Sequence, residues 1–398
     1  MCLNMHTIIL GRLRMQHSKN ISRFLRHSSK QLDGTHNNAV VIAAAVRTPS
    51  TPFKAEEQQL AGIVIDELVK RTLVPREEFK KLIVCSSSNA SATECNERLT
   101  NVAKELGLKG CETHAVQDDI CSITGLRMTL DSLREGKAQC IITGDTRCQY
   151  LEPDDGVLAN ELMTVPVRGK PNAKADPSEP APTLGAAALA WTTYKTAERL
   201  QLQPLALVRE FAVKNNREDA LYHLHGGHPL LPNQINTWDL VTSREPRKPS
   251  INLDTNGNKL CTHDNLHITA SHLLTHLVHS LPAGELGCAY MDGKDGRLMI
   301  IFLEKLVPKI AQVDGLPLLT LYTKEPCPLC DDLVAQLEHK YAGKFRLEKV
   351  YIDRKENVRF LRLFRHDIPV LFFNGQFLCM HKLNEEALHE RLAGLHKG

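Results

Sequence analysis

The chain has 398 residues, 12 cysteines and a formal net charge of +3 at pH 7, and 42% of its residues are hydrophobic. At about 150 residues per domain, this length predicts two or three domains with sizeable cores. No apolar run approaches the roughly 20 residues that cross a bilayer, so we expect no membrane span. The net charge is too small to indicate a nucleic-acid partner. Cysteines spaced so irregularly differ from the disulfide framework of a small secreted domain, and we expect a reducing compartment.

The first 34 residues carry the excess of positive charge. Residues 1–34 contain six lysines and arginines against a single acid, Asp33, so this segment supplies +5 and the rest of the chain −2. Arginines interleaved with apolar residues and serines are typical of a mitochondrial transit peptide. We therefore predict a mitochondrial targeting segment at residues 1–34 and a location in the mitochondrial matrix. The alternative is a disordered basic tail.

From residue 39 onward, apolar strands alternate with helices. Continuous apolar runs predict strands that are buried on both faces, and apolar residues at helical spacing predict the helices between them. The predicted strands are 39–46, 82–85 and 139–143, and the predicted helices are 60–69, 99–106 and 126–133. This alternation predicts an α/β fold with right-handed crossovers and a mostly parallel, covered sheet.

Four segments of this region resemble the thiolases. They correspond to the family's opening strand, the strand after its nucleophile, the start of its C-terminal half and its closing hairpin. The segments are VVIAAAVRTP (40–49), LREGKAQCIITGDT (133–146), GAAALAWTTYKTAERLQLQPLALVREFAV (185–213) and LGCAYMDGKDGRLMIIFLEK (286–305). The resemblance covers residues 38–306 and is nearest to the thiolases of mitochondrial fatty-acid oxidation. It implies a layered α/β fold and a homodimer formed through the sheet layer.

The resemblance also implies three residues for acyl transfer. Cys121, directly before a predicted helix, takes the place of the nucleophile, His263 that of the base, and Cys288 that of the cysteine acid/base. A helix N-terminus lowers the pKa of such a nucleophile and favours the thiolate. An acyl-CoA thiolase that uses these residues is one functional hypothesis.

Several neighbouring positions depart from the family pattern. Asp119 occupies the family's nucleophile position in a gapless alignment, and a carboxylate there would raise the pKa of a nearby thiol. Arg244 stands where the family has an oxyanion-hole side chain, and Thr262 and Asp264 replace the glycine and proline beside the base. The proline-rich residues 152–183 replace the long loop domain that covers coenzyme A. We therefore predict a truncated, noncatalytic thiolase-like domain that does not hold coenzyme A.

A linker at residues 307–315 leads to a second predicted domain, residues 316–398. Its pattern contains a Cys-Pro-Leu-Cys motif between a strand and a helix, and an Asn-Gly hairpin signal between two later strands. The predicted strands are 318–323, 346–352, 370–373 and 376–380, and the predicted helices are 331–337, 356–364 and 383–392. The resulting β-α-β-α-β-β-α order is that of the thioredoxin fold.

The Cys-x-x-Cys spacing in this context predicts a redox site. Cys327 would lie at the helix N-terminus, where the dipole favours a thiolate, and Cys330 one turn inside could resolve a mixed disulfide. Ile368-Pro369, just before a strand, is a candidate cis peptide that faces the dithiol and contacts substrate. Residues 316–395 resemble the glutaredoxin-like family, in particular its Cys-Pro-Leu-Cys members. The resemblance implies thiol–disulfide exchange with protein or small-molecule partners.

The hairpin end of this domain differs from the glutathione-using glutaredoxins. Residues 377–382 (FLCMHK) replace the glycine-rich segment and acid that hold the tripeptide, so we expect no glutathione cofactor. A metal site made of Cys327, Cys330, Cys379 and His381 is an alternative, although the second pair lacks zinc spacing. We predict a mitochondrial thiol–disulfide oxidoreductase fused to a noncatalytic thiolase-like domain. A redox-inert domain and a noncatalytic scaffold protein are the remaining alternatives.

Overall fold

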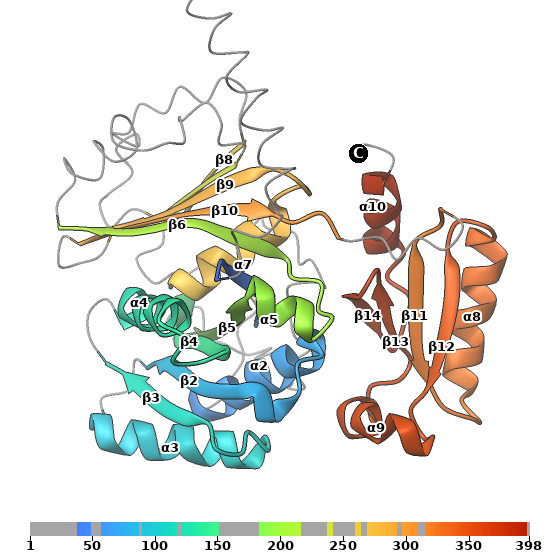
Figure 1. Ribbon diagram of the computed structural model, residues 1–398, viewed down its shortest axis with the longest axis horizontal. Helices are drawn as coiled ribbons and strands as arrows, with labels where there is room; N and C mark the ends of the chain where they lie inside the picture. The colour runs from blue at the N-terminus through green and yellow to red at the C-terminus, as the bar shows by residue number, and fades with distance from the viewer. Residues whose placement is uncertain are drawn as a thin grey trace, which may run out of the picture.

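The structure, a computed structural model, describes residues 38–48, 57–86, 90–117, 121–150, 183–215, 237–241, 259–263, 269–292, 297–308 and 315–395. The predicted targeting segment at residues 1–34 lies outside these residues, as does the linker-like segment except for Thr183. Figure 1 shows a large domain, which ends with β10, and a small C-terminal domain beside it. No helix in the described part of the chain is long and apolar enough to cross a membrane.

The large domain is built on one long sheet flanked by helices. Ten strands of the described residues are hydrogen-bonded in the order β3-β2-β4-β5-β1-β6-β10-β9-β7-β8. The strands are β1 (Val40–Arg47), β2 (Phe79–Cys85), β3 (Glu112–Val116), β4 (Cys140–Tyr150), β5 (Thr183–Thr193), β6 (Ala206–Lys214), β7 (Thr237–Val241), β8 (Lys259–His263), β9 (Leu286–Asp292) and β10 (Leu298–Lys305). The helices are α2 (Glu57–Thr72), α3 (Ala92–Glu105), α4 (Cys121–Arg134), α5 (Tyr194–Arg199) and α7 (Ala270–Ser280), and a short 3-10 helix spans Arg76–Glu78.

The prediction of a mostly parallel sheet is wrong for the middle of this sheet. β2 pairs in parallel with β3 and β4, and β7 pairs in parallel with β8 and β9. The pairs from β4 through β5, β1, β6 and β10 to β9 are all antiparallel. β9 and β10 are separated by only residues 293–297, too few for the crossover that a parallel pair requires, so they form a hairpin.

Two helices, α4 and α7, lie inside the large domain between the two ends of the sheet (Figure 1). Every residue from Ala270 to Val278 of α7 is buried, as expected for a helix enclosed on all sides. Leucines of both helices pack with Ile42 of β1 and Met299 of β10 in one apolar core. All eight residues of β1 are buried, which confirms the strand predicted from its continuous apolar run.

The small domain has the predicted order of elements. Its sheet runs β12-β11-β13-β14, with β11 and β12 parallel and the other two pairs antiparallel. Asn374 and Gly375 form the predicted hairpin turn, both with positive φ. The elements are β11 (Leu318–Thr323), α8 (Pro328–Tyr341), β12 (Arg346–Tyr351), a 3-10 helix (Lys355–Asn357), α9 (Val358–Phe364), β13 (Val370–Phe373), β14 (Gln376–Met380) and α10 (Glu385–Leu395).

The two faces of the small sheet pack against different partners. Leu333 and Leu337 of α8 and Leu388 of α10 pack on one face. On the other face, Phe364 of α9 and Phe372 of β13 belong to the same apolar cluster as buried residues of α2 and β1 in the large domain. The two domains therefore share a continuous core across their interface.

Candidate functional site

The Cys-Pro-Leu-Cys motif lies where α8 begins. Cys327 is the N-cap residue of this helix, and Pro328 occupies its first turn, where a missing N–H costs nothing. Cys327 and Cys330 are joined by a disulfide with their Cα atoms 5.3 Å apart. The predicted helix start at residue 331 is three residues late, because the cysteine itself acts as the cap.

The backbone at this helix start supports a negative charge on Cys327. The N–H of Cys330 donates a hydrogen bond to Cys327 Sγ, with 3.3 Å between nitrogen and sulfur. In the reduced protein this N–H and the positive end of the helix dipole would stabilise a thiolate at Cys327. Cys330 is 1% exposed and Cys327 8% exposed. Cys327, the more exposed of the two, is therefore suited to attack a substrate disulfide. The buried Cys330 is suited to resolve the mixed disulfide that results.

A cis proline lies at the same edge of the small sheet as the motif. The Ile368–Pro369 peptide bond is cis, as predicted. β13 begins at the next residue, Val370, which pairs with Tyr322 near the end of β11. β11 ends just before the motif, and its antiparallel neighbour β13 begins just after Pro369. The proline and Cys327 therefore lie at the same edge of the sheet. The carbonyl oxygen of Pro369 accepts a hydrogen bond from the N–H of His381, at 2.8 Å, which ties this bend to the end of β14.

The surface next to the disulfide combines one apolar side chain with acids. Leu329, between the two cysteines, is 60% exposed. Asp331 and Asp332 follow on exposed positions of the first two turns of α8. A substrate that reaches Cys327 would contact Leu329, and its own basic groups would suit the two acids.

The alternative metal site is not assembled. Cys379 is 4% exposed and packs in the apolar cluster beneath α8 and α10. No group of three or more histidine, cysteine, aspartate or glutamate side chains within the described residues could hold a metal ion. The structure therefore does not bring Cys327, Cys330, Cys379 and His381 together as that alternative requires.

The structure does not test the thiolase-like triad as a unit. Cys121 is the first residue of α4 and His263 the last of β8, but the side chains of both lie outside the described part of the structure. Asp119, Arg244 and Asp264 also lie outside the described residues. Cys288 is placed: it lies within β9, opposite Phe302 of β10, and has no solvent-exposed surface.

A buried polar cluster lies where α4 and α7 begin, next to the first residue of the predicted triad. The hydroxyl of Ser122 accepts a hydrogen bond from the N–H of Ala270, and Asp145 Oδ2 accepts one from the N–H of Ser271 at 2.9 Å. Burial raises the pKa of Asp145, although hydrogen bonds from its neighbours oppose this. Burial also lowers the pKa of His272 to about 3. This cluster was not predicted from the sequence, although the aspartate two residues after the apolar segment QCIIT (139–143) was a signal for it.

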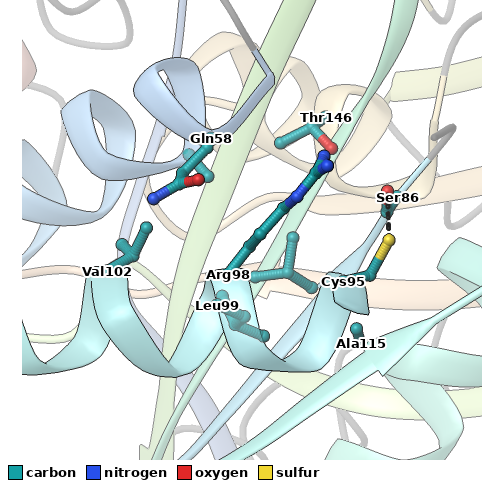
Figure 2. A pocket seen from close by; sticks show the side chains of 10 residues that line it. Gln58, Ser86, Cys95, Arg98, Leu99, Val102, Ala115 and Thr146 are labelled. Carbon is teal, nitrogen blue, oxygen red and sulfur yellow. Dashed lines mark hydrogen bonds between the residues drawn. The ribbon is translucent and has the colours of Figure 1, made fainter. Parts of the chain in front are cut away.

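A separate pocket lies toward the carboxyl ends of β2, β3 and β4 (Figure 2). Its walls are mostly apolar. The side chain of Arg98 extends along it toward Thr146, and Cys95 Sγ lies 3.8 Å from the hydroxyl of Ser86. The described lining includes no carboxylate or histidine that could act as a base for Cys95. Ligands of α/β proteins usually bind at the carboxyl ends of parallel strands. A pocket at this edge could therefore have been predicted from the expected parallel strands.

Comparison with known proteins assigns a family to the small domain and a fold to the large one. Residues 318–393 match the model of the glutaredoxin-like domain (DUF836). Human mitochondrial 3-ketoacyl-CoA thiolase is similar in structure at 11% sequence identity and a TM-score of 0.50, covering 68% of this chain and all of that chain (100%). Acat5 thiolase from Ascaris suum in complex with coenzyme A is also similar, at 16% sequence identity and a TM-score of 0.49, covering 67% of this chain and 100% of that chain. Bacillus anthracis acetyl-CoA acetyltransferase is similar at 15% sequence identity and a TM-score of 0.48, covering 69% of this chain and 100% of that chain. The chain thus joins a thiolase-like fold to a glutaredoxin-like domain, as its sequence predicts.

Proposed function

We propose that the small domain catalyses thiol–disulfide exchange and that the large domain is a noncatalytic thiolase-like platform. The observation that carries the proposal is the position of the two cysteines at the start of α8. Cys327 caps the helix and receives the N–H of Cys330 on its sulfur, while Cys330 lies behind it within bonding distance. This arrangement supplies an activated outer thiol and a resolving inner thiol.

The reaction proceeds in two exchanges. In the reduced domain the Cys327 thiolate attacks one sulfur of a substrate disulfide, and the other substrate sulfur leaves as a thiolate that takes up a proton. Cys330 then loses its proton and attacks Cys327 Sγ, which releases the second substrate thiol and forms the Cys327–Cys330 disulfide. Two electrons pass from the protein to the substrate. An external dithiol reductant returns the domain to its starting state.

The surface favours protein disulfides over glutathione as substrates. The segment of residues 377–382 contributes buried strand residues, including Leu378 and Cys379, to the domain core and lacks the glycine-rich grip of glutathione-using relatives. Leu329 offers an apolar contact beside Cys327, which suits an unfolded or partly folded protein chain. We therefore propose protein disulfides as the main substrate class.

Insulin-disulfide reduction tests the redox proposal. The full chain with dithiothreitol should accelerate insulin reduction, and Cys327→Ser should abolish the acceleration. Cys111→Ser is the matched control, because Cys111 is a partly exposed cysteine outside the motif whose pKa burial raises to about 11. Absence of turnover with dithiothreitol, glutathione and thioredoxin reductase alike would refute the proposal.

The noncatalytic role of the large domain rests on Cys288 and on the polar cluster. Cys288 has no exposed surface within β9, and the start of α7 is occupied by Asp145 and His272. Incubation with acetyl-CoA should leave Cys121 without an acyl adduct in intact-mass and peptide spectra. An adduct on Cys121, or thiolysis of acetoacetyl-CoA, would establish an active thiolase instead.

Location and assembly are parts of the proposal that rest on the sequence alone. The basic, acid-poor residues 1–34 support a mitochondrial matrix location. A fluorescent protein fused behind these residues should enter mitochondria, whereas diffuse fluorescence would contradict the proposal. We also propose a homodimer through the large sheet layer, which light scattering of the full chain tests directly.

A further inference from the structure

The helix α9 and the segment before it carry a concentration of positive charge. Residues 353–366 contain five lysines and arginines against two acids, a net charge of +3 with histidine neutral. All five basic residues are exposed, and we call them together the α9 basic face. They are Arg354, Lys355, Arg359, Arg362 and Arg365.

The helical spacing separates this charge from the apolar side of α9. Arg359, Arg362 and Arg365 follow one another at intervals of three, so they form one stripe along the helix. Phe364 belongs to the apolar cluster shared with the large domain, and the partly buried Phe360 packs against it. The apolar side of α9 is thus turned toward the shared core, and the basic stripe faces solvent.

Ion pairs do not neutralise the α9 basic face. None of its five residues forms an ion pair with another part of the chain that the structure describes. The guanidinium of Arg354 lies 4.4 Å from the ring centroid of Tyr351, and that of Arg359 lies 5.4 Å from the ring centroid of Phe360. Contacts with rings orient the arginines and leave their charge in place.

Nearby carboxylates reduce the charge of the face without cancelling it. Burial lowers the pKa of Arg359, while Tyr322 and Glu77, the latter in the large domain, oppose this. Asp367, the first acid after α9, is paired with Lys70 of the large domain. With Glu77 counted against the net +3 of residues 353–366, the face still has an excess of positive charge.

The α9 basic face adjoins the edge of the small sheet where Cys327 lies. The N–H of Ile352 donates to the carbonyl oxygen of Thr323 at 2.8 Å, so the chain after β12 begins beside the segment that leads to the motif. At its other end the face continues into residues 365–368 and the cis Pro369. Figure 1 shows α9 at the lower end of the small sheet. A partner bound to the face would therefore lie beside the cysteine pair.

The other face of the small sheet has charge of the opposite sign next to the motif. α8 packs on the face opposite to α9. Residues 324–332, which include the motif and the start of α8, contain one lysine against three acids, a net charge of −2. Cys327 thus lies between an acidic surface and a basic one. Such a pair of surfaces fixes the orientation of a partner whose charges complement both.

We infer that the α9 basic face docks an acidic segment of the protein whose disulfide Cys327 reduces. The inference rests on the proposed thiol–disulfide exchange and narrows its substrates to proteins with acids on one side of the disulfide. Attraction between exposed charges raises the rate of association, and docking beside Cys327 brings the disulfide to the thiolate. The position of the face favours a protein substrate over an anionic lipid surface, since a lipid surface presents no disulfide to the adjacent cysteines.

Single-turnover reduction of peptide disulfides by the pre-reduced full chain tests the inference. The probes are homodisulfides of short peptides with a run of glutamates before or after the cysteine, with lysines in the same places, or with serines throughout. At about 20 mM salt, one of the glutamate peptides should react at least about tenfold faster than the serine peptide. The lysine peptide of the same orientation should react more slowly than the serine peptide. The rate of each peptide with dithiothreitol corrects for its intrinsic reactivity.

Salt and charge reversal locate the docking surface. About 0.5 M sodium chloride should remove most of the advantage of the glutamate peptide over the serine peptide. The double variant Arg362→Glu, Arg365→Glu should lower this advantage at least about fivefold at low salt.

A matched double variant separates local charge from net charge. Lys344→Glu, Arg346→Glu changes the net charge equally at exposed positions, and Arg346 pairs with Leu318 at the opposite end of the sheet from the motif. It should keep the advantage within about twofold of the wild type. If the Arg362→Glu, Arg365→Glu variant does not fold, the milder Arg365→Gln and the salt dependence of the wild type decide the question.

Several outcomes would overturn the inference. They are equal rates for the glutamate, serine and lysine peptides, an advantage that salt does not reduce, and equal losses in the two double variants. Faster reduction of oxidised glutathione than of every peptide would assign the face to a small anion. Binding to phosphatidylglycerol vesicles without an advantage for either glutamate peptide would assign it to a lipid surface.

The same experiment distinguishes failure of docking from failure of the exchange. Reduction of all the peptides at one rate, abolished by Cys327→Ser, would refute docking and leave the proposed exchange standing. Reduction of none of them would refute both.

Discussion

The Nζ of Lys70 lies 2.9 Å from Oδ2 of Asp367, and this ion pair joins α2 of the large domain to the loop that carries the cis proline of the small domain. Asp367 is only two residues before Pro369, so the large domain contacts the backbone segment that forms one side of the predicted redox site. Both side chains are mostly buried, at 19% and 14% exposed. Because of this burial, loss of one partner should cost more unfolding free energy than it would for an ion pair on an open surface.

Loss of Lys70 should therefore weaken both the interface and the proposed redox site. In Lys70→Ala, Asp367 is left partly buried without its partner, which should lower the free energy of unfolding by about 1–3 kcal/mol. The loosened proline loop should also reduce the rate of insulin reduction. Denaturant titration and the insulin assay measure the two effects. Lys104→Ala, on an exposed position of α3, is the control, and equal behaviour of the two variants would contradict a role for the ion pair.

Local signals predicted the small domain well, because its elements follow from short segments of sequence. The Asn374–Gly375 turn, the cis bond between Ile368 and Pro369 and the order of elements along the chain were all predicted from adjacent residues. The interface could not be predicted in this way. Lys70 and Asp367 are far apart in the chain, and only the folded structure brings them together.

The misses in the large domain have similar physical reasons. Strand direction depends on how each connection runs, so the alternating pattern suggested parallel strands although the middle of the sheet is antiparallel. β3 was not predicted, because its sequence ETHAV has no apolar run. This segment is a strand because it pairs in parallel with β2. Cys327 and Cys330 could be singled out from the sequence because a two-residue spacer next to a helix start is a local pattern, and the structure places both at the start of α8. Asp145 was missed because its partner Ser271 is remote in sequence.

The shared core predicts that damage to the small domain spreads to the large one. Phe364 is 1% exposed and belongs to the cluster that spans both domains. Phe364→Ala should lower the free energy of unfolding by about 3–5 kcal/mol. Both tryptophans, Trp191 and Trp238, lie in the large domain, so their fluorescence should report a transition shifted to lower denaturant concentration.

A second truncation provides the control for that prediction. Leu388 is fully buried on the opposite face of the small sheet, in a cluster confined to the small domain. Leu388→Ala should shift the transition seen by tryptophan fluorescence less than Phe364→Ala does, even where it destabilises the small domain by a similar amount. A larger shift for Leu388→Ala would mean that the interface does not couple the domains.

The buried Lys305 predicts a particular dependence of stability on pH. Its pKa falls from 10.5 to about 7, first through burial and then through Arg391. Between about pH 7 and pH 10, the unfolded chain therefore binds more protons at this residue than the folded chain, so its contribution to stability rises with pH. As the pH rises over this range, the unfolding free energy of the wild type should increase relative to that of Lys305→Met. A pH-independent difference would show that Lys305 keeps its ordinary pKa in the folded protein.

Leu329 should distinguish protein substrates from small disulfides. Because it is 60% exposed, Leu329→Ser should leave the unfolding free energy almost unchanged. The variant should nevertheless reduce insulin with a kcat/KM several-fold lower than the wild type, since an apolar contact beside Cys327 is lost. Reduction of hydroxyethyl disulfide, which is too small to need that contact, should proceed at the wild-type rate.

Val358 offers the matched control for this experiment. It is also a large exposed apolar residue, at 42%, but it lies at the start of α9, away from the helix that carries the cysteines. Val358→Ser should leave both substrates unaffected. A loss for insulin in both variants would indicate a general effect of surface apolarity, whereas an equal loss for both disulfides in Leu329→Ser would indicate that the residue positions the cysteines and does not contact the protein substrate.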